Sequence, residues 1–412
     1  MSPALQLLLQ LLLILLLARA CGRILRRFGQ PQVIGEMMSG LLLGPLVFGA
    51  WLPGLHSTLF APDSLPALSG LATFGVAMFM FIIGLELRAP GGSRAQLRSA
   101  LSISLAGIAT SMALGLLLAP WLHPRFAPEG VGFWPFALFF SSALSVTAFP
   151  VLARILKDRG MSASRPGRLA LGAAVIDDAG LWILLAGVLA LAQNDSVSGV
   201  ATTLTGALGL AALAFGLLRP LLARMLRRGD GGIGASTFVW IVIGALAFAA
   251  IGEWIGLHAI FGAFLFGAAL PRADRLLHGM ASRLEPVTML LLLPVLFAVA
   301  GQSATPDALD GSGLGFFLAI LLVAVLGKLV GCTLGAKSGG HGWRDSLAVG
   351  SLMNARGLME LVVIKIGLDA GLIGPELFTL LFGMALATTL MASPLLGLAA
   401  GRAGVDRAWG KR

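Results

Sequence analysis

Long apolar stretches alternate with short polar connections along almost the whole chain. Thirteen of these stretches have the length, about 17–25 residues, that crosses roughly 30 Å of hydrocarbon as a helix. The pattern therefore predicts an all-α polytopic membrane protein with thirteen transmembrane helices. We expect them at residues 3–20, 31–51, 66–87, 99–120, 132–156, 168–192, 199–223, 233–252, 255–271, 284–302, 313–336, 345–368 and 374–398.

Composition agrees with a membrane protein and changes how the charge is interpreted. Of the 412 residues, 57% are hydrophobic and 12% are charged, and the mean hydropathy is +0.92. The net charge of +10 does not indicate nucleic-acid binding, because the basic residues lie in alternate short connections between spans. By the positive-inside rule, this alternation predicts an external N-terminus and a cytoplasmic C-terminus.

Two adjacent carboxylates, Asp177 and Asp178, lie in the middle of the apolar stretch 168–192. An ionised carboxylate at the centre of a bilayer costs at least about 2.5–3.5 kcal/mol, so each needs a partner or a function. Successive helix positions point about 100° apart, and the two acids cannot share one partner on one face. We expect one acid to be paired while the other faces a cavity.

Two spans contain sequences that disfavour an unbroken helix, one around Pro150 and the other at Asn354-Ala355-Arg356-Gly357. Broken helices at membrane depth are typical of the ion sites of secondary transporters. The two spans are seven apart and so run in opposite directions. We therefore predict two inverted six-helix repeats, each with one broken helix, joined by the seventh span.

Four short motifs, taken with this layout, resemble the monovalent cation/proton antiporters. The resemblance is closest to the second cation/proton antiporter branch, which includes bacterial sodium/proton exchangers, Kef-type potassium efflux systems and plant cation/proton exchangers. The motifs are Gly35–Pro45, Gly84–Leu87, Gly262–Gly267 and Gly357–Leu361.

The resemblance implies a domain organisation and a cellular setting. A dimerisation domain would comprise residues 1–98 and 233–312, and a core ion-transport domain 99–198 and 313–398. Residues 199–232 would form a linker helix, and 399–412 a short cytoplasmic tail. A homodimer in the bacterial inner membrane, with an elevator-like movement of the core, is the implied form.

The same resemblance implies a cation and proton site. Carried over residue by residue, it places this site at Asp178, with Asp177 close by and further oxygens from Thr147, Ser145 and Asn354. The lysine of the electrogenic exchangers falls on Lys328, which would pair with Asp177 and release a second proton for each cation. Because Kef-type members usually have a neutral residue in place of the first acid, Asp177 favours the electrogenic sodium type.

Other buried charges are expected to support the site. We predict that Arg356 and Glu360 compensate the partial charges of the helix ends where the broken helices cross. Glu36 and Glu86 would belong to the other domain or its gate.

The residues also bear on the mechanism of transport. A carboxylate binds a hard monovalent cation or a proton, but not both at once, so competition couples the two. The chain has no Walker phosphate loop and no ligand set for a redox group, so no cofactor is expected. The alternatives are an electroneutral K⁺/H⁺ antiporter, a sodium-coupled symporter of organic anions and a cation channel. The sequence does not distinguish Na⁺, Li⁺ and K⁺.

Overall fold

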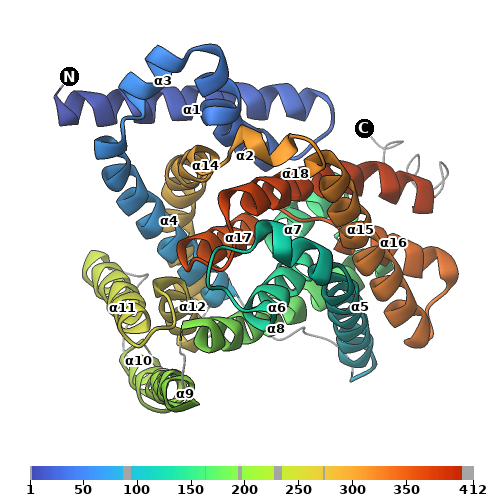
Figure 1. Ribbon diagram of the computed structural model, residues 1–412. Coiled ribbons are helices and arrows are strands. Elements are labelled where there is room, and N and C mark those ends of the chain that lie inside the picture. The colour runs from blue at the N-terminus through green and yellow to red at the C-terminus, as the bar shows by residue number, and fades with distance from the viewer. Residues whose placement is uncertain are drawn as a thin grey trace. The chain divides into compact units, whose positions relative to one another are not determined.

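The computed structural model describes residues 2–86, 94–162, 164–193, 197–226, 234–271 and 274–400 (Figure 1). Within these ranges every regular element is a helix, which confirms the predicted all-α class. The helices are α1 (Pro3–Arg27), α2 (Gln32–Leu43), α3 (Pro53–Leu59), α4 (Leu65–Glu86), α5 (Arg94–Phe126), α6 (Phe133–Leu144), α7 (Phe149–Asp158), α8 (Arg165–Gln193), α9 (Val197–Ala212), α10 (Arg219–Leu226), α11 (Ala235–Trp254), α12 (Ala259–Ala269), α13 (Asp274–Val287), α14 (Leu293–Gln302), α15 (Gly313–Ser338), α16 (Trp343–Met353), α17 (Leu358–Asp369) and α18 (Pro375–Ala400).

Short segments of other helical types connect some of these helices. Three are π-helical, at Pro45–Gly49, Leu213–Leu218 and Thr288–Leu292, and two are 3₁₀-helical, at Pro62–Ser64 and Pro306–Leu309. Residues 401–412 of the predicted cytoplasmic tail lie outside the described ranges.

Ten helical segments of the described chain are long and apolar enough to cross a membrane, and α16 with α17 forms an eleventh that is bent by 46°. The two other predicted spans correspond to short apolar helices, α2 and α12. Their 12 and 11 residues reach only about 16–18 Å at 1.5 Å per residue. Each stops before a proline, Pro45 and Pro271, which disfavours helical backbone in the residue that precedes it.

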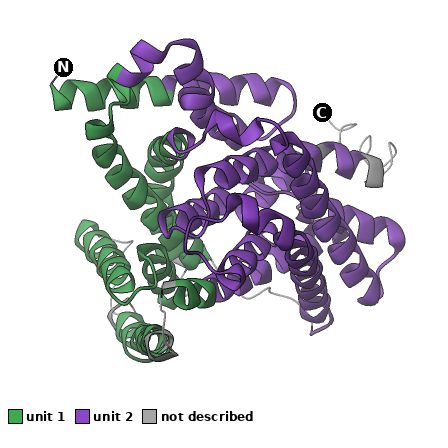
Figure 2. Ribbon diagram, in the orientation of Figure 1, with its two compact units in different colours: residues 1–15, 58–88, 186–299 green, residues 16–57, 89–185, 300–412 purple. Residues whose placement is uncertain are grey.

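The chain divides into two compact units (Figure 2). Unit 1 comprises residues 1–15, 58–88 and 186–299. Within it α4 packs against α12, and α12 against α11. A Cβ at Gly84 would lie 2.2 Å from the carbonyl oxygen of Phe264, and a Cβ at Gly267 would lie 2.2 Å from that of Phe81. The Gly84–Leu87 and Gly262–Gly267 motifs therefore allow a close contact between two helix backbones.

Unit 2 comprises residues 16–57, 89–185 and 300–412 and contains both broken helices. Two of its long helices, α5 and α15, pack together along glycines spaced four residues apart on α15. A Cβ at Gly327, Gly331 or Gly335 would lie 2.6–2.8 Å from atoms of α5. This spacing places the glycines on one face of α15, so the helix backbones approach closely and hold Lys328 against α5.

Candidate functional site

The first break, residues 145–148, separates α6 from α7. Pro150 lies in the first turn of α7, where its missing N–H costs nothing, and it disfavours helical backbone just before it. Ser145 ends α6 on both backbone and side chain: its hydroxyl donates to the carbonyl of Ser142 at 2.7 Å, as does its backbone N–H at 2.9 Å.

The second break, residues 354–357, separates α16 from α17. Gly357 has a φ of 149°, which a residue with a side chain rarely adopts. The two breaks are joined directly, because the N–H of Ala148 donates to the carbonyl of Ala355 at 3.1 Å. The two unwound segments, far apart in the sequence, therefore meet inside unit 2.

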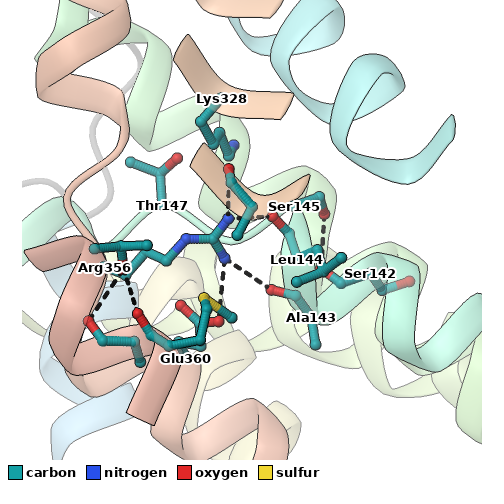
Figure 3. Close-up of polar contacts among 12 residues, drawn as sticks. Ser142, Ala143, Leu144, Ser145, Thr147, Lys328, Arg356 and Glu360 are labelled. Atoms are coloured by element: carbon teal, nitrogen blue, oxygen red, sulfur yellow. Dashed lines mark hydrogen bonds and ion pairs between the residues drawn. The ribbon is translucent and has the colours of Figure 1, made fainter. Parts of the chain in front are cut away.

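Arg356 reaches from the second break to the C-terminal end of α6 (Figure 3). Its guanidinium donates to the carbonyls of Leu144 at 2.6 Å, Ala143 at 3.3 Å and Ala324 at 3.3 Å. It also pairs with Glu360 at 3.1 Å, in the first turn of α17. A positive charge thus lies at the carbonyl end of one helix and a negative charge at the N–H end of another, as each helix dipole favours.

Asp177 is held by three donors from three different helices or breaks. Its Oδ2 accepts from Lys328 Nζ of α15 at 2.5 Å and from the Thr147 hydroxyl of the first break at 2.8 Å. Its Oδ1 accepts from the Ser104 hydroxyl of α5 at 2.6 Å. Both oxygens are therefore engaged, although Asp177 is only 1% exposed.

Asp178 differs from its neighbour in that one of its carboxylate oxygens has no described hydrogen-bond partner. It is 2% exposed, and its Oδ1 has no hydrogen-bond partner among the described residues. Both amide atoms of Asn354, which is fully buried in the second break, likewise lack a described partner. Because buried polar atoms are nearly always hydrogen-bonded, such atoms are candidates for a contact with an ion or with ordered water.

The structure brings five of the residues that the sequence singled out into direct contact, in two groups. Asp177, Thr147 and Lys328 are in direct contact, and Arg356 contacts Glu360. Glu36 is buried on α2, where Oε1 accepts from Gln32 at 3.0 Å. Glu86 is at the end of α4 in unit 1.

Sequence reasoning missed Ser104 and Thr389. Ser104 is one of several serines on α5, and nothing in its spacing separates it from the others. Thr389, fully buried on α18, has its hydroxyl 2.9 Å from the carbonyl of Arg356 and 2.7 Å from that of Ala385. Ser104 meets Asp177 because α5 lies beside α8, and Thr389 meets Arg356 because α18 lies beside the second break; the sequence shows neither neighbour.

Comparisons with known proteins add a family and a fold. A family model described as "Sodium/hydrogen exchanger, transmembrane" matches residues 12–399. The chain is 36% identical over 392 residues to the Na⁺/H⁺ antiporter NhaS4 of Synechocystis, covering 94% of this chain and 95% of that protein. It is 34% identical over 411 residues to K⁺/H⁺ antiporter 1 of Saccharomyces cerevisiae, covering 96% of this chain. It spans only 46% of that yeast protein.

A solved structure shares the fold. The sodium proton antiporter MjNhaP1 from Methanocaldococcus jannaschii matches with a TM-score of 0.67, covering 98% of this chain and 100% of that one. The sequence identity is 15%, so this likeness concerns the arrangement of helices alone.

Proposed function

This chain belongs to the sodium/hydrogen exchanger family, and we propose that it exchanges Na⁺, and also Li⁺, for protons at Asp178. As a member of that family it is a multi-pass membrane protein and a secondary transporter rather than an enzyme, and it exchanges a monovalent cation for protons. The choice of Na⁺, the binding residues and the proton count are the proposed parts.

The charge balance of the buried cluster carries the proposal. Five acidic or basic side chains among the described residues of unit 2 are at most 2% exposed: Asp177, Asp178, Lys328, Arg356 and Glu360. Lys328 pairs with Asp177, and Arg356 pairs with Glu360. Asp178 is the acid left over, and one monovalent cation or one proton neutralises it. Since the same carboxylate cannot hold both, occupancy by one requires release of the other.

Oxygen atoms around the two breaks support cation binding. A hard cation such as Na⁺ prefers carboxylate, amide, hydroxyl and backbone oxygens. We propose that Asp178 supplies a carboxylate oxygen and Asn354 its amide oxygen. Thr147, Ser145 and the unwound backbone of the first break supply the remainder. Asp177, which is paired with Lys328 before the cation binds, contributes charge from close by.

The direct test is Asp178→Asn in proteoliposomes that contain a pH-sensitive dye. Addition of Na⁺, Li⁺, K⁺ and Rb⁺ in turn should move protons through the wild type with Na⁺ and Li⁺, and through the variant with none. Folding should be retained, because neutralising a buried acid removes a desolvation cost. Asp369→Asn, at an acid whose side chain is half exposed, is the matched control. Normal exchange in Asp178→Asn would refute the assignment.

The same panel separates the alternatives. Exchange with K⁺ but not Na⁺ would support the potassium type, which the name of the yeast relative brings into consideration. Uptake of a labelled organic anion with Na⁺ would support symport. Currents far above carrier rates would support a channel.

We further propose that exchange is electrogenic. The positive charge of Na⁺ beside Asp178 weakens the attraction between Lys328 and Asp177, so the lysine can release a proton together with Asp178. Two protons would then exchange for one cation, and each charge moved is worth about 2.3 kcal/mol per 100 mV of membrane potential. Solid-supported-membrane recordings test this. Proton exchange seen by the dye without a cation-induced current would establish the electroneutral alternative.

The finer architecture is also proposed. Adding α2 and α12 to the eleven longer segments gives thirteen spans, and the breaks around 145–148 and 354–357 would occupy equivalent positions of two inverted repeats. We propose a homodimer in a bacterial inner membrane, with an external N-terminus, a cytoplasmic C-terminus and an elevator-like core. Cysteine labelling from each side of the membrane tests the orientation, and native mass spectrometry tests the dimer.

A further inference from the structure

Of the two hydroxyls that donate to Asp177, the Ser104 hydroxyl makes the shorter hydrogen bond. Ser104 is fully buried on α5, and its hydroxyl donates to Asp177 Oδ1 at 2.6 Å. The hydroxyl of Thr147 also reaches Asp177, at 2.8 Å, but it lies 3.2 Å from the carbonyl of Met353 as well. A hydroxyl donates its one proton to one acceptor at a time. Thr147 therefore alternates between Asp177 and the Met353 carbonyl, whereas Ser104 donates to Asp177.

The bond from Ser104 fixes the orientation of the Asp177 carboxylate. With Oδ1 anchored to α5, Oδ2 is directed at Lys328 on α15. Asp178 follows Asp177 directly on α8, so the Lys328 ammonium, 2.5 Å from Asp177 Oδ2, also lies near Asp178. An ammonium that left Asp177 for Asp178 would occupy the position where a cation binds, and it would compete with that cation.

We infer that Ser104 is a positioning residue of the cation site, which keeps Lys328 on Asp177 and so leaves Asp178 free for Na⁺. This inference rests on the proposed function, in which Asp178 binds the cation. Ser104 does not contact the cation in this account, and its effect passes through Asp177.

The close packing of α5 on α15 does not depend on the Ser104 hydroxyl. A Cβ at Gly107 would lie 2.5 Å from the sulfur of Cys332, and one at Gly331 would lie 2.7 Å from the carbonyl of Ala106. The α5 backbone just after Ser104 is therefore held close to α15, which carries Lys328, and the serine hydroxyl meets Asp177 of α8 at 2.6 Å. Loss of the hydroxyl leaves this packing in place while it releases one oxygen of Asp177.

The experiment compares Ser104→Ala with Ser111→Ala. Ser111 lies two turns along α5, is also fully buried, and its hydroxyl has no described hydrogen-bond partner, so it controls for loss of a buried hydroxyl from the same helix. Two measurements are made: thermal stabilisation of the purified protein by NaCl, and dye-reported exchange in proteoliposomes. Choline chloride at equal ionic strength is the salt control.

We expect Ser104→Ala to need about tenfold more Na⁺ for half-maximal stabilisation and exchange, in line with the strength of a hydrogen bond to a charged group. Its exchange rate at saturating Na⁺ should stay within about twofold of the wild type, and Ser111→Ala should match the wild type in both. Ser104→Thr, which keeps the hydroxyl, should recover most of the Na⁺ affinity. In an Asp177→Asn background, Ser104→Ala should cause no further change in Na⁺-induced stabilisation.

Three results would overturn the inference. The first is an unchanged Na⁺ affinity in Ser104→Ala, and the second is a loss of Na⁺ affinity in Ser111→Ala as large as that in Ser104→Ala. The third is that Ser104→Ala lowers the Na⁺ affinity as much in the Asp177→Asn background as in the wild type. The last two would assign the hydroxyl to helix packing. A wild-type protein that Na⁺ neither stabilises nor drives to exchange protons would instead overturn the proposed function.

Discussion

Removal of the Arg356 side chain should weaken the protein more than most single substitutions. Arg356→Ala would leave the Glu360 carboxylate, which is 0% exposed, as an unpaired buried charge, and breaking a buried pair in this way costs about 3–5 kcal/mol. The carbonyl of Leu144 would also lose the donor that lies 2.6 Å away, at a cost of about 1–3 kcal/mol. Together these losses approach the whole stability of a typical domain, about 5–15 kcal/mol.

Two further variants keep the experiment informative when Arg356→Ala does not fold. Arg356→Lys retains the positive charge for Glu360 but lacks the planar group that donates to Ala143, Leu144 and Ala324 together. We expect it to cost about 1–3 kcal/mol. The double variant Arg356→Met with Glu360→Met removes both charges and should be more stable than Arg356→Ala, because no lone charge remains.

Thermal unfolding in detergent, monitored by size-exclusion chromatography, measures the stability of each variant. The Na⁺ concentration that gives half-maximal stabilisation measures the affinity of the cation site. If Arg356 holds the ends of the broken helices in place, Arg356→Lys should lower both. Lower stability of Arg356→Lys with a normal Na⁺ affinity would show that the Arg356–Glu360 pair only stabilises the fold and does not act on the cation site. Normal stability and transport in Arg356→Ala would refute the compensation of helix-end charges altogether.

Two other predictions concern unit 2. Gly331→Ala should destabilise the protein by about 1–3 kcal/mol, because the new Cβ would lie 2.7 Å from the Ala106 carbonyl. Gly315→Ala, on the same helix but with open space around the new Cβ, should not destabilise it. Equal unfolding temperatures of the two variants would contradict the close packing of α5 and α15. Burial, and secondarily the charge of Arg165, lower the pKa of His341 in the α15–α16 connection from its ordinary 6.5, with Asp345 opposing. Its contribution to stability should therefore be complete above about pH 6.5 and fall as the pH drops toward the lower folded pKa. His341→Gln should show a weaker loss of unfolding temperature between pH 7 and pH 5 than the wild type, and an identical pH dependence would contradict this role.

Much of the fold is determined by the sequence because its causes are local. A run of apolar residues long enough to cross a bilayer requires a helix whatever surrounds it, and most predicted spans have a counterpart in the structure. Pro150 and Gly357 mark the two breaks for equally local reasons, since one restricts the residue before it and the other adopts a φ of 149°. The cost of burying Asp177 and Asp178 also follows from their place in an apolar stretch.

Only the tertiary structure assigns different surroundings to the two acids. The sequence predicts that one acid is paired, and the family resemblance suggests Asp177 with Lys328. The folded chain adds Ser104 and Thr147 to Asp177 and leaves an oxygen of Asp178 without a described partner. Helix periodicity gives the direction of a side chain relative to its own helix. Which helix lies in that direction depends on contacts between helices far apart in the chain, such as α5, α8 and α15. The partners of a buried charge are therefore known only from the packed structure.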